Sequence, residues 1–368
     1  MVRSKSGGVL CFVAAAALAA LSVLWPTRDD SASAANPRPA ARASRTRSAP
    51  TMKSGMEAPD FPPGIFIPGG RYGLSDFKGK ALVLFFFDND YLHDDAAFAR
   101  WNDMVREMGN KPVKFIAVGV SHLAREAAAY ARTVNLQSPL FVDTFQAMSS
   151  RYGEGDAEAH WVWSFRIVGP DGKVVRSSSE LTADEVEKAI EGIGWKYKDS
   201  GYDPRLNPAI ELLEWNQWEA GMGKLRPMLK TYPKATAESA RKLYEEVKKE
   251  GAQWKSDAEA ALESNPVAAY DLYARVANCF AGDDLAKGVE QPLKQLKGTK
   301  AVKDELTARG LWEQLSVAVG RASISDRLRL AGAAEGIAAR CPNTPTGERA
   351  VIFAKHLREM NGPVRVGD

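Results

Sequence analysis

The chain has 368 residues, of which 45% are hydrophobic and 26% are charged, and its formal net charge is +3. This is ordinary globular composition, and the length suits about two domains of roughly 100–200 residues each. Part of the positive charge comes from four arginines in one Ala/Pro/Ser-rich stretch, Arg38, Arg42, Arg45 and Arg47. The net charge therefore gives no case for nucleic-acid binding.

The N-terminus, residues 1–26, has the pattern of a targeting segment. Arg3 and Lys5 precede an almost wholly apolar run over residues 9–25. The run is longer than a secretory core of about 7–15 residues and shorter than a span of about 20, so a cleaved signal peptide and an uncleaved membrane tether are both open. Residues 32–34 (Ala-Ser-Ala) resemble a cleavage site. We expect export to an extracytoplasmic location, periplasmic or secreted.

Residues 27–54 are rich in Ala, Pro, Arg and Ser and show no apolar periodicity. Such a segment cannot bury enough surface to offset the entropy lost on ordering, so we interpret it as a linker. Its arginines serve either a solvated tether or contact with an anionic membrane surface.

Residues 55–195 alternate between strand and helix patterns. Continuous apolar runs and a Gly-Pro-Asp-Gly turn predict strands over 80–87, 112–120, 140–143, 161–168 and 173–176. Amphipathic patterns predict helices over 96–108, from an N-cap at Ser121 to 131, and from an N-cap at Thr182, with a capping box to Glu185, to 193. Strands joined by helices with a closing hairpin indicate an α/β fold with a mixed sheet.

Residues 204–362 are dominated by helical periodicity. Two Asn-Pro pairs, at Asn207 and Asn265, have the pattern of an N-cap with proline in the first turn. Further amphipathic stretches cover 237–249, 303–320 and 347–360. They predict an all-α domain of stacked helical hairpins without a strict repeat. Stacked helices offer extended surfaces, which favours a protein or peptide partner.

Three elements in order carry a family resemblance. They are GMEAPDF at 55–61, YGLSDFKGK at 72–80 ahead of the apolar strand, and GPDGK at 169–173. This order resembles the thioredoxin-like redoxin family, of the alkyl hydroperoxide reductase and thiol-specific antioxidant (AhpC/TSA) type. The resemblance covers residues 55–195 and implies a thioredoxin-like fold with thiol-disulfide or peroxidase chemistry.

The chain departs from that family at the reactive positions. Aligned on the Phe-Phe-Phe of the central strand, the family's Cys-x-x-Cys falls on Tyr91 and Asp94, and its single peroxidatic cysteine falls near Asp95. The family's proline opposite the thiol falls within 160–164, which contain none, and residues 55–195 contain no cysteine. Thiol chemistry needs a thiolate, so the degenerate site predicts a pseudoenzyme with no catalytic residue.

The polar segment at that position has three interpretations. Capping of the following helix by Asp94 or Asp95 is the simplest. A small-molecule or peptide groove is the second, with ligand-binding candidates Asp88, Asp90, Tyr91, His93, Asp94, His160 and Trp161. The third is a metal site in which His93, Asp94 and His160 would suit zinc or iron. We predict no cofactor.

Two cysteines, Cys279 and Cys341, remain after an exported chain loses its signal. In an oxidising compartment they would form a disulfide, whereas the alternative is two unrelated buried thiols. Both alternatives stay open on spacing alone.

The sequence thus favours an exported, redox-inactive thioredoxin-like module joined to a helical interaction domain, acting in binding or assembly. One alternative is a thiol-disulfide oxidoreductase or peroxidase of the redoxin type that uses non-standard cysteines. The other is a metal-dependent activity at His93, Asp94 and His160. We lean against an enzyme.

Overall fold

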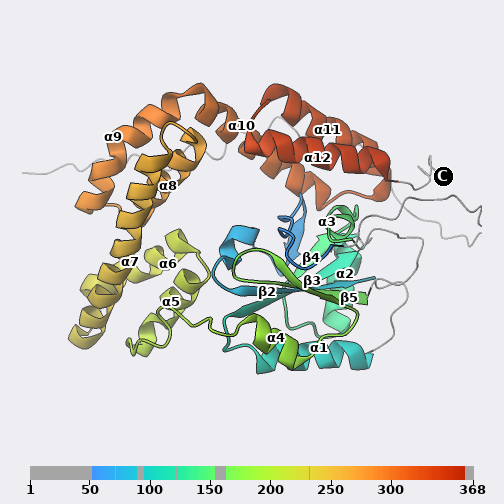
Figure 1. Ribbon diagram of the computed structural model, residues 1–368, viewed down its shortest axis with the longest axis horizontal. Coiled ribbons are helices and arrows are strands. Elements are labelled where there is room, and N and C mark those ends of the chain that lie inside the picture. The colour runs from blue at the N-terminus through green and yellow to red at the C-terminus, as the bar shows by residue number, and fades with distance from the viewer. Residues whose placement is uncertain are drawn as a thin grey trace, which may run out of the picture. The chain divides into compact units, whose positions relative to one another are not determined.

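The computed structural model describes residues 52–70, 72–88, 95–120, 123–153, 163–231 and 233–360. All of them belong to one compact unit, Arg47–Asp368. An α/β part comes first along the chain and an all-helical part follows it (Figure 1). The predicted fold class is therefore confirmed, while the predicted domain limits remain predictions.

The α/β part contains one mixed six-stranded sheet. Its strands are β1 Ile65–Ile67, β2 Ala81–Phe87, β3 Val113–Val120, β4 Leu140–Asp143, β5 Trp163–Val168 and β6 Val174–Ser178. They lie in the order β1-β4-β3-β2-β5-β6, in which β2, β3 and β4 are parallel and the others are antiparallel to their neighbours. The structure adds the three-residue strand β1, which the sequence did not predict.

Strand β2 lies at the centre of the sheet and is buried along its whole length. It pairs with β3 on one side and with β5 on the other. Its side chains alternate between two apolar clusters, one on each face of the sheet. Burial on both faces explains why the strand is a continuous apolar run rather than an alternating one.

Helices cover both faces of the sheet. They are α1 Asp95–Glu107, α2 Ala124–Thr133, α3 Ala147–Arg151 and α4 Ala183–Ala189. Figure 1 shows α1 and α4 along one side of the sheet, where they share a core cluster with β2. The predicted capping box of α4 is confirmed, because Glu185 N donates to Thr182 Oγ1 and Thr182 N donates to Glu185 Oε2, both at 3.3 Å. The N-cap predicted at Ser121 is wrong, since α2 begins at Ala124 after an extended Leu123.

The remaining part of the chain is helical. Its α-helices are α5 Asn207–Glu214, α6 Trp218–Thr231, α7 Lys234–Ala261, α8 Pro266–Cys279, α9 Asp284–Gly298, α10 Lys300–Val319, α11 Arg327–Arg340 and α12 Pro345–Glu359. Short 3-10 turns are η1 Leu74–Phe77, η2 Pro204–Leu206 and η3 Ile324–Asp326. The Asn265 side chain caps α8 as predicted, accepting from Ala268 N at 3.0 Å.

Two features of the helical part differ from the sequence prediction. Asn207 already has helical dihedrals and lies inside α5, whose N-cap residue is Leu206. The chain after Asn207 forms two helices, α5 and α6, and Asn216 adopts a left-handed φ of 55° between them. Helices α6 and α9 were missed because each contains an internal proline, and α11 because small residues form much of its buried face.

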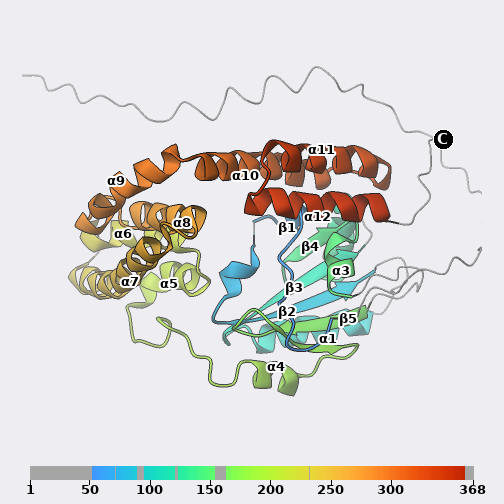
Figure 2. The same cartoon turned by 45° about the horizontal axis from the view of Figure 1, so that its top comes forward.

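The helical part touches the α/β part at several places, among them α10 against β1, and two of these places bear on the site. The first is the end of α5, described below. At the second, His356 of α12 lies 2.7 Å from the Phe145 carbonyl through Nε2, and Arg349 lies 3.1 Å from Asp60. Figure 2 shows α12 beside the end of the sheet where α3 lies, in agreement with the contact between α3 and α12. His356 thus helps to hold α12 on the α/β part.

No helix within the described ranges is both long and apolar enough to cross a membrane. The predicted tether at residues 9–25 and the linker at 27–54 fall wholly or mostly outside these ranges.

Candidate functional site

The predicted degenerate site follows the C-terminal end of β2, a central strand of the sheet. Strand β2 ends at Phe87, which pairs with Trp163 at the start of β5, and α1 begins at Asp95. The two segments that would form the site thus depart from neighbouring strands. Asp88 directly follows β2 and is partly buried. The other candidates lie outside the described residues, so their grouping stays a prediction: Asp90, Tyr91, His93, Asp94, His160 and Trp161.

The same limit applies to the predicted metal site at His93, Asp94 and His160. Within the described ranges, no three His, Cys, Asp or Glu side chains gather as metal ligands would.

Aromatic packing accounts for Trp163. Its ring meets that of Phe85 edge-to-face at a centroid distance of 4.5 Å and that of Phe98 at 5.6 Å. These arrangements are typical of a buried aromatic core. Trp163 thus packs on aromatic side chains of the sheet and α1, and its half-buried ring also lines a shallow cavity.

The two cysteines do not pair. Cys279 and Cys341 are both free and buried, and they belong to different core clusters. Of the two alternatives that the sequence left open, the structure has two separate buried thiols and no disulfide between them. Burial raises the pKa of Cys279 to about 12 and also raises the pKa of Cys341. Both thiols are thus kept in the protonated, unreactive form at neutral pH.

A buried ion pair joins the sheet to the helical part. Lys80, directly before β2, places Nζ 2.9 Å from Oε2 of Glu214 at the end of α5, and the two side chains are only 9% and 1% exposed. The other carboxylate oxygen accepts from the backbone N–H groups of Tyr197 and Lys198 at 2.5 and 3.0 Å. Lys80 Nζ also lies 5.3 Å from the ring centroid of Trp195.

These contacts determine the charge of Glu214. Burial opposes ionisation, but the hydrogen bonds from the Tyr197 amide and the Lys80 ammonium outweigh it and lower the pKa of Glu214. The carboxylate is thus ionised, with one oxygen hydrogen-bonded to two backbone amides and the other in the ion pair. A buried pair of this kind is stable only with such additional hydrogen bonds.

The two residues after Glu214 hold the same junction. Trp215 packs edge-to-face on Trp195, at a centroid distance of 5.7 Å, and on Phe77 at 6.2 Å. Asn216 Nδ2 donates to the carbonyl oxygens of Asp76 and Lys78, at 3.2 and 3.1 Å. Its left-handed φ suits asparagine, which tolerates that conformation better than most residues. Three consecutive residues therefore fix α5 to the loop that precedes β2.

A second lysine and glutamate lie beside this pair and do not join. Lys114 projects from β3 with its Nζ 5.4 Å from the ring centroid of Trp215, and Glu211 lies one turn before Glu214 on α5. The two side chains form no ion pair or hydrogen bond with any described residue, although Glu211 is close enough to act on Lys114 electrostatically. Burial lowers the pKa of Lys114, and Glu211 partly opposes this.

Two cavities flank this open pair. Their volumes are about 350 and 360 Å³, and Lys114, Glu211 and Trp215 line both of them. The first also contacts Trp195 and Ile210, and the second is completed by residues that include Tyr72, Asp76, Gln217 and Lys224. These volumes lie in the lower part of the range of ligand pockets, about 300–1,000 Å³. The site offers a cationic donor, an anionic acceptor and indole walls, an arrangement that suits the binding of a small polar molecule.

Lys80 and Lys114 were not among the residues predicted from sequence to form a site. Each is a charge at the start of an otherwise apolar strand, in KALVLFFF and PVKFIAVGV. Burying a charge is costly unless it is paired, so a lone lysine in such a strand indicates a partner elsewhere. That signal could have identified the junction, although not which residues complete it.

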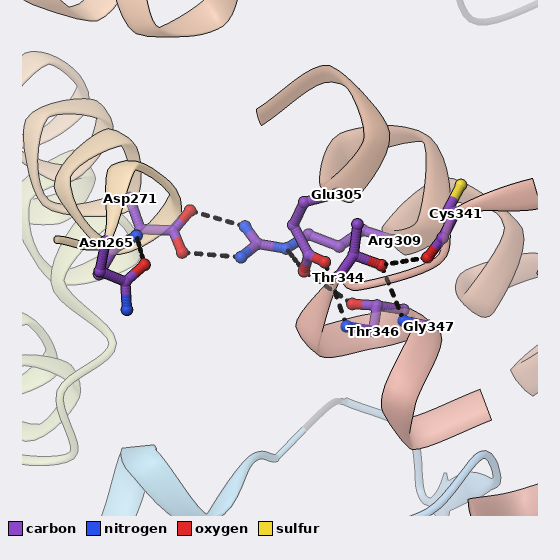
Figure 3. Close-up of polar contacts among 9 residues, drawn as sticks. Asn265, Asp271, Glu305, Arg309, Cys341, Thr344, Thr346 and Gly347 are labelled. Carbon is purple, nitrogen blue, oxygen red and sulfur yellow. Dashed lines mark hydrogen bonds and ion pairs between the residues drawn. The ribbon is translucent and has the colours of Figure 1, made fainter. Parts of the chain in front are cut away.

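A separate charged network joins helices within the helical part. Arg309 of α10 donates to both carboxylate oxygens of Asp271 at 2.6 and 2.7 Å, and through Nε to Glu305 at 2.7 Å (Figure 3). Glu305 also accepts from the N–H and hydroxyl of Thr346, at 3.1 and 2.7 Å. With its partners supplied by α8, α10 and the start of α12, this network fastens helices together and engages all three nitrogen atoms of the Arg309 guanidinium.

Comparisons with known proteins bear on the α/β part. No protein-family model matches this chain. No curated protein matches it either. Among solved structures, it is similar to a putative protein disulfide isomerase from Bacteroides thetaiotaomicron, at 19% identity and a TM-score of 0.33, over 39% of this chain and 91% of that one.

Two further solved structures show a similar degree of likeness. A putative thiol:disulfide interchange protein DsbE from Chlorobium tepidum is 21% identical with a TM-score of 0.32, over 39% of this chain and 96% of that one. The mitochondrial 2-Cys peroxiredoxin from Plasmodium falciparum is 17% identical with a TM-score of 0.34, over 38% and 94%. The likeness to thioredoxin-like redoxins is distant and covers about two fifths of this chain.

Proposed function

We propose that this chain is a binding protein built on a thioredoxin-like scaffold that lacks redox-active cysteines. The observation that carries the proposal is the position of its cysteines. Residues 55–195 contain none, and Cys279 and Cys341 are buried with raised pKa values. Thiol-disulfide exchange and peroxide reduction both require an accessible thiolate, which this arrangement does not supply.

Enzyme assays test the proposal directly. We expect the purified protein to show no disulfide reductase turnover with a dithiol reductant and no peroxidase turnover with hydrogen peroxide. The matched control is the double variant Cys279→Ala/Cys341→Ala, followed by circular dichroism to check folding. Turnover in the natural protein that disappears in the folded double variant would contradict the proposal and favour an oxidoreductase with non-standard cysteines.

The proposed partner is a protein or peptide held by the helical part. Stacked helices present extended surfaces to such partners. The junction contacts of Glu214, Trp215 and Asn216 support this role, because they hold α5 firmly on the α/β part. Co-purification with the natural chain, compared with a chain truncated after α4, tests whether partners depend on the helices.

Export belongs to the same proposal and rests on residues 1–26 alone. Cell fractionation and N-terminal sequencing of the mature protein test it together. A mature chain that starts shortly after residue 34 in an extracytoplasmic fraction supports a cleaved signal. An intact N-terminus in the membrane fraction supports a tether, and an intact chain in the cytoplasm contradicts export.

A further inference from the structure

We infer that the junction between the sheet and α5 binds a small zwitterion, an α-amino acid or dipeptide, whose carboxylate meets Lys114 and whose ammonium meets Glu211. This inference rests on the proposed binding function and names a ligand class for it. Lys114 and Glu211 line both junction cavities. Trp215 also lines both cavities and belongs to a buried core cluster of the sheet.

The first argument is that both charges are available. Lys114 and Glu211 have no hydrogen bond or ion pair with any described residue, whereas the neighbouring Lys80 and Glu214 are fully engaged. The Trp215 ring and the charge of Glu211 only partly replace the hydration that the partly buried ammonium loses. A ligand carboxylate at Lys114 would restore that interaction through a charge-assisted hydrogen bond.

The second argument is the balance of charge. The second cavity is lined by Lys224 and Asp76 besides the shared lysine and glutamate. A site for phosphate or a dicarboxylate would carry an excess of cations. The equal numbers of each sign in the second cavity, none of them joined in an ion pair with a described residue, fit a ligand that itself carries one charge of each sign.

The third argument concerns shape and rigidity. Trp195 and Ile210 give the first cavity apolar walls, which suits an apolar ligand side chain. Trp215 is held by Phe77 and Trp195, and Asn216 fastens the next residue to the loop before β2. The walls are thus set before a ligand arrives, so little ordering cost falls on binding.

Isothermal titration calorimetry of the full chain tests the inference with L-leucine, L-phenylalanine and the dipeptide Leu-Phe. We expect saturable binding of at least one of them. N-acetyl-L-leucine and L-leucinamide each lack one of the two charges, and so do the corresponding phenylalanine derivatives. Each should bind at least about tenfold more weakly than its parent, as should the parent to Lys114→Met or Glu211→Gln.

Matched controls are Lys294→Met and Glu290→Gln, exposed residues of α9 outside both cavities. They should leave affinity within twofold. Glu211 is exposed, so Glu211→Gln should fold even if Lys114→Met does not. Absence of saturable heat with all three probes up to 10 mM, or binding that Glu211→Gln leaves unchanged, overturns the inference. Neither result affects the thiol assays, whose outcome separately decides the proposed function.

Discussion

Two neighbouring sets of lysine, glutamate and tryptophan meet at the junction, and they differ in one respect. In each set a lysine from the start of a parallel strand lies over an indole and faces a glutamate of α5. Lys80 and Glu214 close to 2.9 Å, whereas Lys114 and Glu211 stay apart. The first set is closed and the second is open.

The difference shows how similar residues can serve stability or binding. In the closed set, two backbone amides and the ammonium satisfy the Glu214 carboxylate, so the cost of burying it is met within the protein. In the open set the cost of partly burying Lys114 is met only in part, and two cavities adjoin it. We therefore expect the closed set to control folding and the open set to control binding.

The largest expected effect comes from opening the closed set. Glu214→Gln keeps the shape of the side chain but leaves the Lys80 ammonium buried without its counter-charge. Loss of one partner of a buried pair costs about 3–5 kcal/mol, which we expect as a fall in the free energy of unfolding in urea. Glu211→Gln is the matched control on the same helix and should change it by less than about 0.5 kcal/mol. Equal effects of the two substitutions would remove the distinction between the sets.

Removal of the lysine from the closed set should cost less. Lys80→Met leaves Glu214 buried, but the carboxylate keeps its hydrogen bonds from the Tyr197 and Lys198 amides. We expect a loss of about 2–3 kcal/mol in urea unfolding. The double variant Lys80→Met/Glu214→Gln should lose less than the sum of the two single losses, because neither charge is then left alone. Additive losses would show that the pair is not coupled.

The hydrogen bonds of Asn216 hold α5 beside both sets, and we expect their loss to have an intermediate effect on the free energy of unfolding. Asn216→Ala loses two hydrogen bonds to backbone carbonyls and places an alanine at a φ of 55°. Together these should cost about 1–3 kcal/mol in thermal or urea unfolding. Asn216→Gly loses the same hydrogen bonds without the backbone strain, so it should cost less. If Asn216→Gly lost as much free energy of unfolding as Asn216→Ala, or more, the left-handed φ would not contribute to the effect.

Acid should weaken the closed set selectively. The pKa of Glu214 is lower in the folded protein than the value near 4.3 expected when unfolded, so its contribution is complete above that value. It is lost as pH falls through the lower folded pKa. Urea unfolding from pH 6 to pH 3 should therefore show a steeper loss for the natural chain than for Glu214→Gln. Parallel pH profiles would mean that Glu214 does not titrate as the contacts imply.

The sequence predicted local features of this junction but not the junction itself. Strands β2 and β3 and the cap at Asn265 follow from periodicity and turn chemistry within a few residues. The closed set instead joins positions 80 and 214, more than 130 residues apart. The break between α5 and α6 depends on Asn216 finding carbonyl partners in another part of the chain. Such long-range choices leave no periodic signal in the sequence.

The smallest expected effect on stability is the one that most sharply separates the two sets. Lys114→Met removes an ammonium whose burial is offset only in part, by the Trp215 ring and the charge of Glu211, and the methionine side chain can still cover Trp215. We expect the free energy of unfolding to stay within about 0.5 kcal/mol of the natural value or to rise slightly, because an unpaired charge leaves a partly buried position. Lys80→Met, the same substitution in the closed set, is the matched control. A loss of 2 kcal/mol or more from Lys114→Met would mean that Lys114 already has a stabilising partner in the folded protein, and its charge would then be no more available to a ligand than that of Lys80.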